Sequence, residues 1–178
     1  MIKKLAFLFV LLFSFYSVGC NHTQQGPPDY QTKPFDSLAT LEVGGEKYSV
    51  SINKSADGSY VLSFIAPETI GGVTIEKNAE GLFFSSGSVK IPIKDGSNIT
   101  AEALKLFELP KSDLVSVTPE MLGGVKVNTT LYNCDFGTVK VYLSYDTGLP
   151  VVMEASIKGT DIKLSFSSFN IITEETAK

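Results

Sequence analysis

Few residues of this chain carry side chains suited to covalent or acid–base chemistry. Its only histidine is His22, and its only cysteines are Cys20 and Cys134. Neither the cysteine and histidine spacings of zinc sites nor the glycine-rich motifs of hydrolases and nucleotide-binding loops occur. The acidic residues are scattered singly, although a fold could still bring two of them together. The sequence therefore predicts a protein without catalysis, metal or cofactor.

One serine and one lysine do have the spacing of a known nucleophile pair. Ser51-Ile-Asn-Lys54 matches the SxxK pattern, in which a lysine activates a serine from one helical turn away. The surrounding residues alternate between apolar and polar, which predicts a strand, and residues three apart in a strand point to opposite faces. Lys54 is therefore not expected to reach Ser51.

Cys20 is the residue whose flanking sequence predicts a definite covalent modification. Two lysines at positions 3 and 4 precede an uncharged run that is shorter than the roughly 20 residues a spanning helix needs. The run closes on Ser17-Val18-Gly19-Cys20, which is similar to a bacterial lipobox, although Ser17 stands where the usual pattern has leucine. We expect Cys20 to carry a lipid anchor at the extracytoplasmic face of the cell membrane. The alternative is ordinary secretory cleavage after Gly19, which also places the domain outside the cytoplasm.

Lipidation of Cys20 would leave Cys134 without a cysteine partner in the chain. No histidine or arginine flanks Cys134 in sequence to lower its pKa. We therefore interpret Cys134 as a small buried apolar residue rather than a reactive thiol.

The chain is expected to contain one folded domain. We predict a signal peptide at 1–19, a lipidated cysteine and proline-containing tether at 20–36, a β domain at 37–173 and a polar tail at 174–178. All 15 basic residues are lysines; two of them leave with the signal, so 13 remain against 19 acidic residues, a net charge of −6. An acidic surface argues against a nucleic-acid partner, and it leaves membrane attachment to the anchor.

Alternating apolar and polar residues dominate from residue 37 onward. Tyr48, Val50 and Ile52, for example, alternate with polar residues, as expected of a half-buried strand. Comparable short runs separated by turn residues lie at 60–66, 73–77, 81–85, 88–93, 125–134, 138–145, 150–157 and 161–169. This spacing predicts a mainly β fold: a curved antiparallel sheet, or half-open barrel, of about ten strands.

Residues 100–109 are the one interval that favours a helix over a strand. Thr100 is a candidate N-cap, Pro110 a stop, and Ala103, Leu104 and Phe107 form an apolar stripe for packing on the sheet. In addition, two segments resemble each other, beginning Pro67-Glu-Thr-Ile-Gly-Gly and Pro119-Glu-Met-Leu-Gly-Gly. We interpret each as one helical turn that leads into a new strand.

The order of meander, central helix and second meander resembles a known family. With Thr147-Gly-Leu-Pro150 leading into a strand and Leu164-Ser-Phe-Ser-Ser-Phe169 closing the sheet, residues 37–172 are similar to the LolA and LolB lipoprotein carrier and receptor superfamily, and to clostridial spore-germination lipoproteins of that fold. The resemblance implies a half-open barrel around a hydrophobic cavity that holds acyl chains. The carrier's cavity arginine has no counterpart in a chain without arginine, and shuttling is incompatible with a permanent anchor. The transfer mechanism is therefore not implied.

The sequence favours two functions over a third, a hydrolase, which would need carboxylates clustered on a concave face. The first is binding of a lipid-like ligand in an apolar cavity, for which the candidate lining residues are Phe64, Phe84, Leu104, Phe107, Leu143, Met153 and Phe166. Apolar stripes more often form plain core, so these residues are equally candidates for packing. The second is a protein-interaction module, monomeric or dimeric, that positions or regulates an envelope or spore-cortex enzyme.

Overall fold

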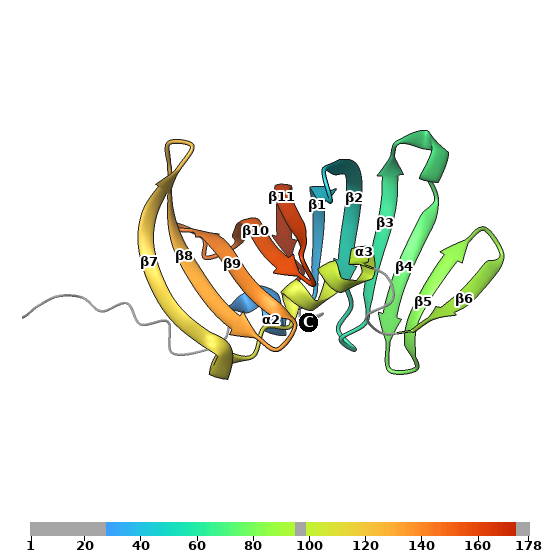
Figure 1. The fold of residues 1–178 in the computed structure, drawn as a ribbon, viewed down its shortest axis with the longest axis horizontal. Coiled ribbons are helices and arrows are strands. Elements are labelled where there is room, and N and C mark those ends of the chain that lie inside the picture. The colour runs from blue at the N-terminus through green and yellow to red at the C-terminus, as the bar shows by residue number, and fades with distance from the viewer. Residues whose placement is uncertain (1–27, 95–98, 174–178) are drawn as a thin grey trace, which may run out of the picture.

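The computed structural model describes residues 28–94 and 99–173 (Figure 1). Cys20, the expected signal peptide, the tether up to residue 27 and the polar tail lie outside the described residues. Eleven strands form one antiparallel sheet in the order β6-β5-β4-β3-β2-β1-β11-β10-β9-β8-β7. The mainly β, open-sheet architecture expected from the sequence is thus confirmed, with eleven strands where about ten were predicted.

Two meanders meet in the middle of this sheet. The first consists of β1 (Phe35–Val43), β2 (Glu46–Lys54), β3 (Tyr60–Ala66), β4 (Val73–Asn78), β5 (Gly81–Ser86) and β6 (Val89–Ile93). The second consists of β7 (Leu114–Leu122), β8 (Val125–Cys134), β9 (Gly137–Ser144), β10 (Pro150–Ile157) and β11 (Thr160–Ile171). Antiparallel pairing of β1 with β11 joins the two, and β6 and β7 form the two edges of the sheet (Figure 1).

The strands bury one face of the sheet, which we call the inner face. On β2 the alternate residues Val50 and Ile52 are buried between partly or fully exposed neighbours. On β9 Val139 and Val141 are buried on the same face, and Tyr142 is buried on the opposite one. The period-two pattern of the sequence therefore corresponds to burial, as expected for a sheet with one covered side. The opposite side, the outer face, is mostly polar, although Val127, Tyr142 and Val152 form a small buried cluster on it.

A short helical segment covers the middle of the inner face (Figure 1). It consists of α3 (Ile99–Glu102) and the 3-10 helix η2 (Ala103–Phe107), and a second 3-10 turn, η3 (Lys111–Asp113), leads into β7. The ring of Phe107 lies 5.2 Å from that of Phe35, 6.1 Å from that of Tyr60 and 6.1 Å from that of Phe166. This cluster joins the helical segment to strands of both meanders.

The predicted helix at 100–109 is helical but shorter and tighter than expected. Thr100 lies inside α3 rather than capping it, and the backbone changes to 3-10 geometry at Ala103. Residues three apart align in a 3-10 helix, so Leu104 stacks with Phe107 and Ala103 with Leu106. All four side chains are fully buried against the sheet, so the predicted packing of the apolar stripe is confirmed.

The folded region begins before the end of the expected tether. Asp29–Thr32 forms one helical turn, α2, and β1 begins at Phe35. Tyr30 is fully buried and its ring packs edge-on to that of Phe169 at 6.3 Å. The burial of Tyr30 and Phe35 therefore holds residues 28–35 against the domain, although the prolines of this stretch suggested a coil.

The two similar Pro-Glu segments adopt different structures. Pro67 precedes the 3-10 turn η1 (Glu68–Ile70), and β4 follows, as predicted. Pro119 instead lies within β7, so the predicted turn there is wrong. Proline lacks the N–H that an interior strand must donate, and an edge strand can accommodate it where the backbone faces outward. Pro92 occupies the other edge strand, β6, in the same way.

Candidate functional site

The inner face is covered in its middle but carries exposed apolar side chains toward both edges. Val89 and Ile91 on β6 are 55% and 52% exposed, and Val117 and Met121 on β7 are 56% and 65% exposed. Residues directly opposite in the sheet share a face: Ile91 pairs with Phe84 and through it with the buried Ile75, while Val117 pairs through Thr130 with the buried Val141. We call these four residues the apolar margins. Exposed aliphatic residues gathered on one face are typical of a binding surface.

A pocket of about 320 Å³ lies between the helical segment and the β4–β6 side of the sheet. We call it the helix-side pocket. Its sheet wall includes a row of paired residues on the inner face, with Lys77 opposite Leu82 and Leu82 opposite Ile93. Its helical wall is formed by Ala101, Leu104 and Lys105, and Asn78 and Gly81 complete the lining.

Two lysine–glutamate pairs border the helix-side pocket. Lys77 forms an ion pair with Glu108, just beyond η2, and Lys105 Nζ lies 2.9 Å from Glu102 Oε2. The Glu102 side chain is buried, whereas Lys77, Lys105 and Glu108 are partly exposed. The pocket therefore combines apolar walls with ammonium groups near its opening, an arrangement suited to a ligand with a tail and a polar head.

The structure separates the seven candidate lining residues into different environments. Leu104 lines the helix-side pocket. Phe64, Phe107, Leu143 and Met153 are buried in the core, Phe166 is half-buried against it, and Phe84 is half-buried on β5. Contact of any of the seven with a ligand stays a prediction. Residues that sequence reasoning did not select are the apolar margins, Leu82 and Ile93, although their alternation with polar neighbours was a usable signal.

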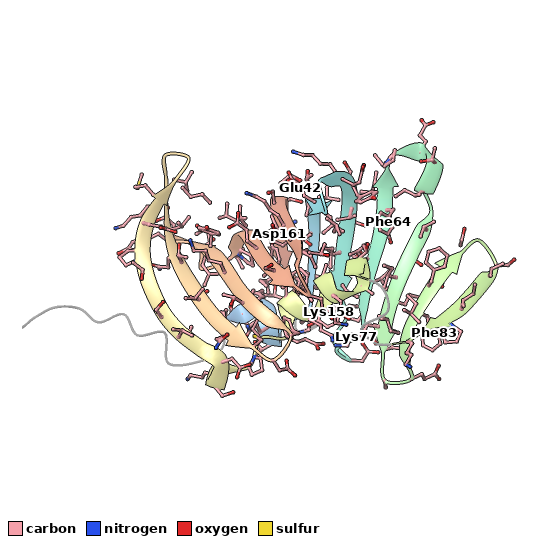
Figure 2. The ribbon with its side chains drawn as sticks, in the orientation of Figure 1. Glu42, Phe64, Lys77, Phe83, Lys158 and Asp161 are labelled. Atoms are coloured by element: carbon pink, nitrogen blue, oxygen red, sulfur yellow. The ribbon has the colours of Figure 1, made fainter. Side chains whose placement is uncertain are left out.

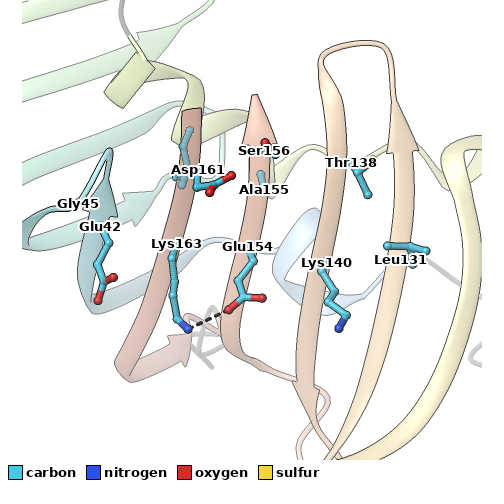
Figure 3. A pocket seen from close by; sticks show the side chains of 11 residues that line it. Glu42, Gly45, Leu131, Thr138, Lys140, Glu154, Ala155, Ser156, Asp161 and Lys163 are labelled. Carbon is cyan, nitrogen blue, oxygen red and sulfur yellow. Dashed lines mark ion pairs between the residues drawn. The ribbon is translucent and has the colours of Figure 1, made fainter. Parts of the chain in front are cut away.

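A row of alternating charges crosses the outer face of the sheet. In register, Lys47 lies opposite Glu42, Glu42 opposite Lys163, Lys163 opposite Glu154 and Glu154 opposite Lys140. The Nζ–Oε distance is 2.8 Å both for Lys47–Glu42 and for Lys163–Glu154, and Figure 3 shows the second pair. Opposite charges on neighbouring strands favour this register over a shifted one.

A groove of about 490 Å³ follows this charge row. Its lining residues are Glu42, Gly45, Leu131, Thr138, Lys140, Glu154, Ala155, Ser156, Asp161, Ile162 and Lys163 (Figure 3). Burial alone would raise the pKa of Glu154, but hydrogen bonds from Lys163 and Tyr142 hold that pKa below its usual value. Because the charged groups largely satisfy one another, the groove shows no preference for a ligand of either sign.

The described residues offer little for covalent or metal chemistry. Within residues 28–94 and 99–173, no three His, Cys, Asp or Glu side chains are grouped to hold a metal ion. Lys54 is buried on the inner face, while Ser51 belongs to the other set of alternating residues in β2, so the SxxK pair does not meet. Burial, with a contribution from Asp113, raises the pKa of the Cys134 thiol to about 11. Among the same residues, no helix is long and apolar enough to span a membrane.

Known proteins resemble this chain in structure rather than in sequence. No protein-family model and no curated protein sequence matches it. An uncharacterised conserved protein from Thermus thermophilus superposes with a TM-score of 0.53 and 10% identity, covering 82% of this chain and 83% of that one. MucB, known from Pseudomonas aeruginosa, superposes with a TM-score of 0.50 and 15% sequence identity, and the match covers 82% of this chain and 56% of MucB.

A LolA superfamily protein from Nitrosomonas europaea gives a TM-score of 0.45 and 9% identity, covering 80% of this chain and 87% of that one. Identities this low describe a shared fold alone. The open, mainly β architecture of this chain therefore recurs in MucB and in the Thermus protein.

Proposed function

We propose that this protein is a membrane-anchored, extracytoplasmic lipoprotein without catalytic activity, and that it binds a lipid-like ligand on the inner face of its sheet. The observation that carries the proposal is the pair of apolar margins on either side of the covered core. Val89 and Ile91 on one edge strand, and Val117 and Met121 on the other, are each more than half exposed. Figure 1 shows these two strands at opposite ends of the sheet, with the helical segment between them.

Leaving these side chains in water is unfavourable. Burial of apolar surface stabilises by about 25 cal/mol per Å², so a ligand that covers the margin at either edge gains a few kcal/mol before the cost of ordering it. An acyl chain suits such a surface because it is flexible and needs no hydrogen-bond partners. The outer face carries the row of paired charges at its centre.

The anchor is the second part of the proposal. Lipidation at Cys20 would leave eight residues before Asp29, the first residue of α2, a connection of at most about 30 Å when fully extended. The folded domain would then remain close to the bilayer, where lipid-like ligands are concentrated. Two or three acyl chains on one cysteine give stable attachment without a spanning helix.

A protein-interaction module is the second candidate function, and the edge strand β7 favours it. Eight of its nine residues are exposed, and it borders one apolar margin. An extended segment of another protein could pair with such an edge and cover Val117 and Met121. Pro119 removes one N–H from this edge, which limits the pairing.

Site-specific photo-crosslinking separates the two functions. A photoreactive amino acid replaces Val117 on the inner face and, as the matched control, Thr118 on the adjacent outer face, in the full-length protein in its own membrane. We expect position 117 to form adducts with the mass of a lipid and position 118 to form none. Adducts at 117 with the mass of a protein would favour the interaction module instead. Equal lipid labelling at both positions would contradict binding on the inner face.

A further inference from the structure

We propose that the helix-side pocket binds a single-chain anionic amphiphile, with the tail between the sheet and the helical segment and the head group at Lys77. This inference rests on the proposed function and specifies its ligand class. It depends on three features of the pocket: its size, its apolar walls and the position of Lys77 next to the apolar residues Leu82 and Ile93 of its row.

The size of the pocket limits the number of tails. At about 320 Å³ it is near the lower end of the roughly 300–1,000 Å³ range of ligand pockets. Leu82 and Ile93 on the sheet side face Leu104 and Ala101 on the helical side. A narrow space between four aliphatic side chains accommodates one hydrocarbon chain and excludes a bundle of several.

Lys77 is one of two lysines on this row of the inner face, and unlike the buried Lys54 it is partly exposed. Its neighbours across the sheet are the buried Tyr60 on β3 and the half-buried Leu82 on β5, yet its own side chain is 34% exposed. Figure 2 shows Lys77 near one end of β4. The carbon stem of a lysine can pack along an apolar wall while its ammonium group stays at the opening. Lys77 therefore marks the place where a tail would end and a charged head would begin.

The present partner of Lys77 indicates the sign of that head group. Glu108 provides a carboxylate to Lys77 Nζ, and its side chain is 40% exposed. An ammonium group has three N–H donors, more than one carboxylate oxygen uses, so a ligand carboxylate or phosphate can join or replace Glu108. Lys105, also a lining residue, adds a second positive charge, and its partner Glu102 is buried.

The test measures binding of three probes with the same tail to delipidated protein by calorimetry: dodecanoate and dodecyl phosphate below their micelle concentrations, and dodecanol below its solubility limit. We expect both anions to bind roughly fivefold or more tightly than the alcohol, the size of a half-exposed charge-assisted hydrogen bond. Lys77→Met should remove that difference in affinity while dodecanol still binds. Glu108→Gln should increase the affinity for both anions. Lys47→Met, on the outer face, is the control and should change nothing. The ratio of the dissociation constants of dodecanoate and dodecyl phosphate distinguishes a carboxylate head group from a phosphate head group.

Each failure has a separate meaning. Equal binding of all three probes would overturn the role of Lys77 and leave the proposed function standing. Binding that survives Ile93→Trp, a change that fills the pocket, would overturn the pocket as the tail site. Binding of none of the probes would overturn the ligand class, while crosslinking at position 117 tests the proposed function independently. Thermal unfolding of each variant shows whether it is folded.

Discussion

Lys54 Nζ donates a hydrogen bond of 2.6 Å to the main-chain carbonyl of Gln31. This bond connects β2 to α2, and Lys54 also lies with its ammonium group 5.4 Å from the centre of the Tyr60 ring. Burial lowers the pKa of Lys54, with Glu108 acting in the opposite direction. The lysine of the SxxK pattern is therefore a structural residue that holds the N-terminal turn against the inner face.

Replacing Lys54 by methionine should destabilise the protein by about 1–3 kcal/mol, because the partly buried carbonyl of Gln31 loses a charged donor. Urea unfolding followed by circular dichroism measures the change. Lys47→Met is the matched control: its ion pair with Glu42 is exposed and its loss should cost less than about 1 kcal/mol. Equal losses in both variants would show that the contact with Gln31 contributes nothing specific.

Cys134 should react slowly with thiol reagents in the folded protein and quickly in urea. Its pKa is raised from 9.0 to about 11, mainly by burial, so the folded state keeps a proton that the unfolded state loses. The contribution to stability is therefore complete below pH 9 and is lost as the pH rises toward 11. Unfolding midpoints should fall more steeply across this window in the wild type than in Cys134→Ala. Parallel curves for the two proteins would refute the assignment.

Core and margin residues should respond differently to truncation. Met153 is fully buried, and Met153→Ala should cost about 2–5 kcal/mol through the cavity it leaves. Ile91 is half exposed, so Ile91→Ser should cost much less and should weaken binding of an apolar probe instead. Denaturation and probe titration of both variants give the comparison. A loss of stability at Ile91 as large as at Met153 would indicate that the margin is part of the core.

The edge prolines should limit self-association. Pro119→Val gives β7 an N–H group at an outward-facing position, and we expect a concentration-dependent increase in dimer by light scattering after gel filtration. Thr118→Val, on the outer face, adds apolar surface without adding an N–H and is the control. If Pro119→Val behaves like Thr118→Val, proline at this position does not protect the edge.

Most of the fold could be predicted from alternation of apolar and polar residues. Nine strands, their turns and the packing of Leu104 and Phe107 follow from that pattern and from the helix formers at 100–109. The strands β1 and β7 were missed because each lies next to or contains a proline, Pro34 or Pro119, and local rules assign such stretches to tethers and turns. Only the pairing of β1 with β11 shows that Phe35 belongs to the core.

The site was harder to predict than the fold. Met153 and Ile91 both follow period two, and the sequence cannot show which of them the helical segment covers. Lys77 and Glu108 are 31 positions apart, and the fold alone brings them together beside the helix-side pocket. Which residues can contact a ligand therefore depends on the tertiary structure, whereas strand-forming residues can be recognised from the local sequence.

Native mass spectrometry of the full-length protein, extracted from its own membrane in mild detergent, tests the central claim most directly. Proteolysis that removes the N-terminal segment with Cys20 separates a lipid bound by the domain from one attached to the cysteine. We expect a non-covalent adduct with the mass of a lipid-like molecule on the remaining domain, and loss of that adduct in the double variant Ile91→Ser and Val117→Ser. A domain that carries no adduct in any preparation, while folded, would contradict it.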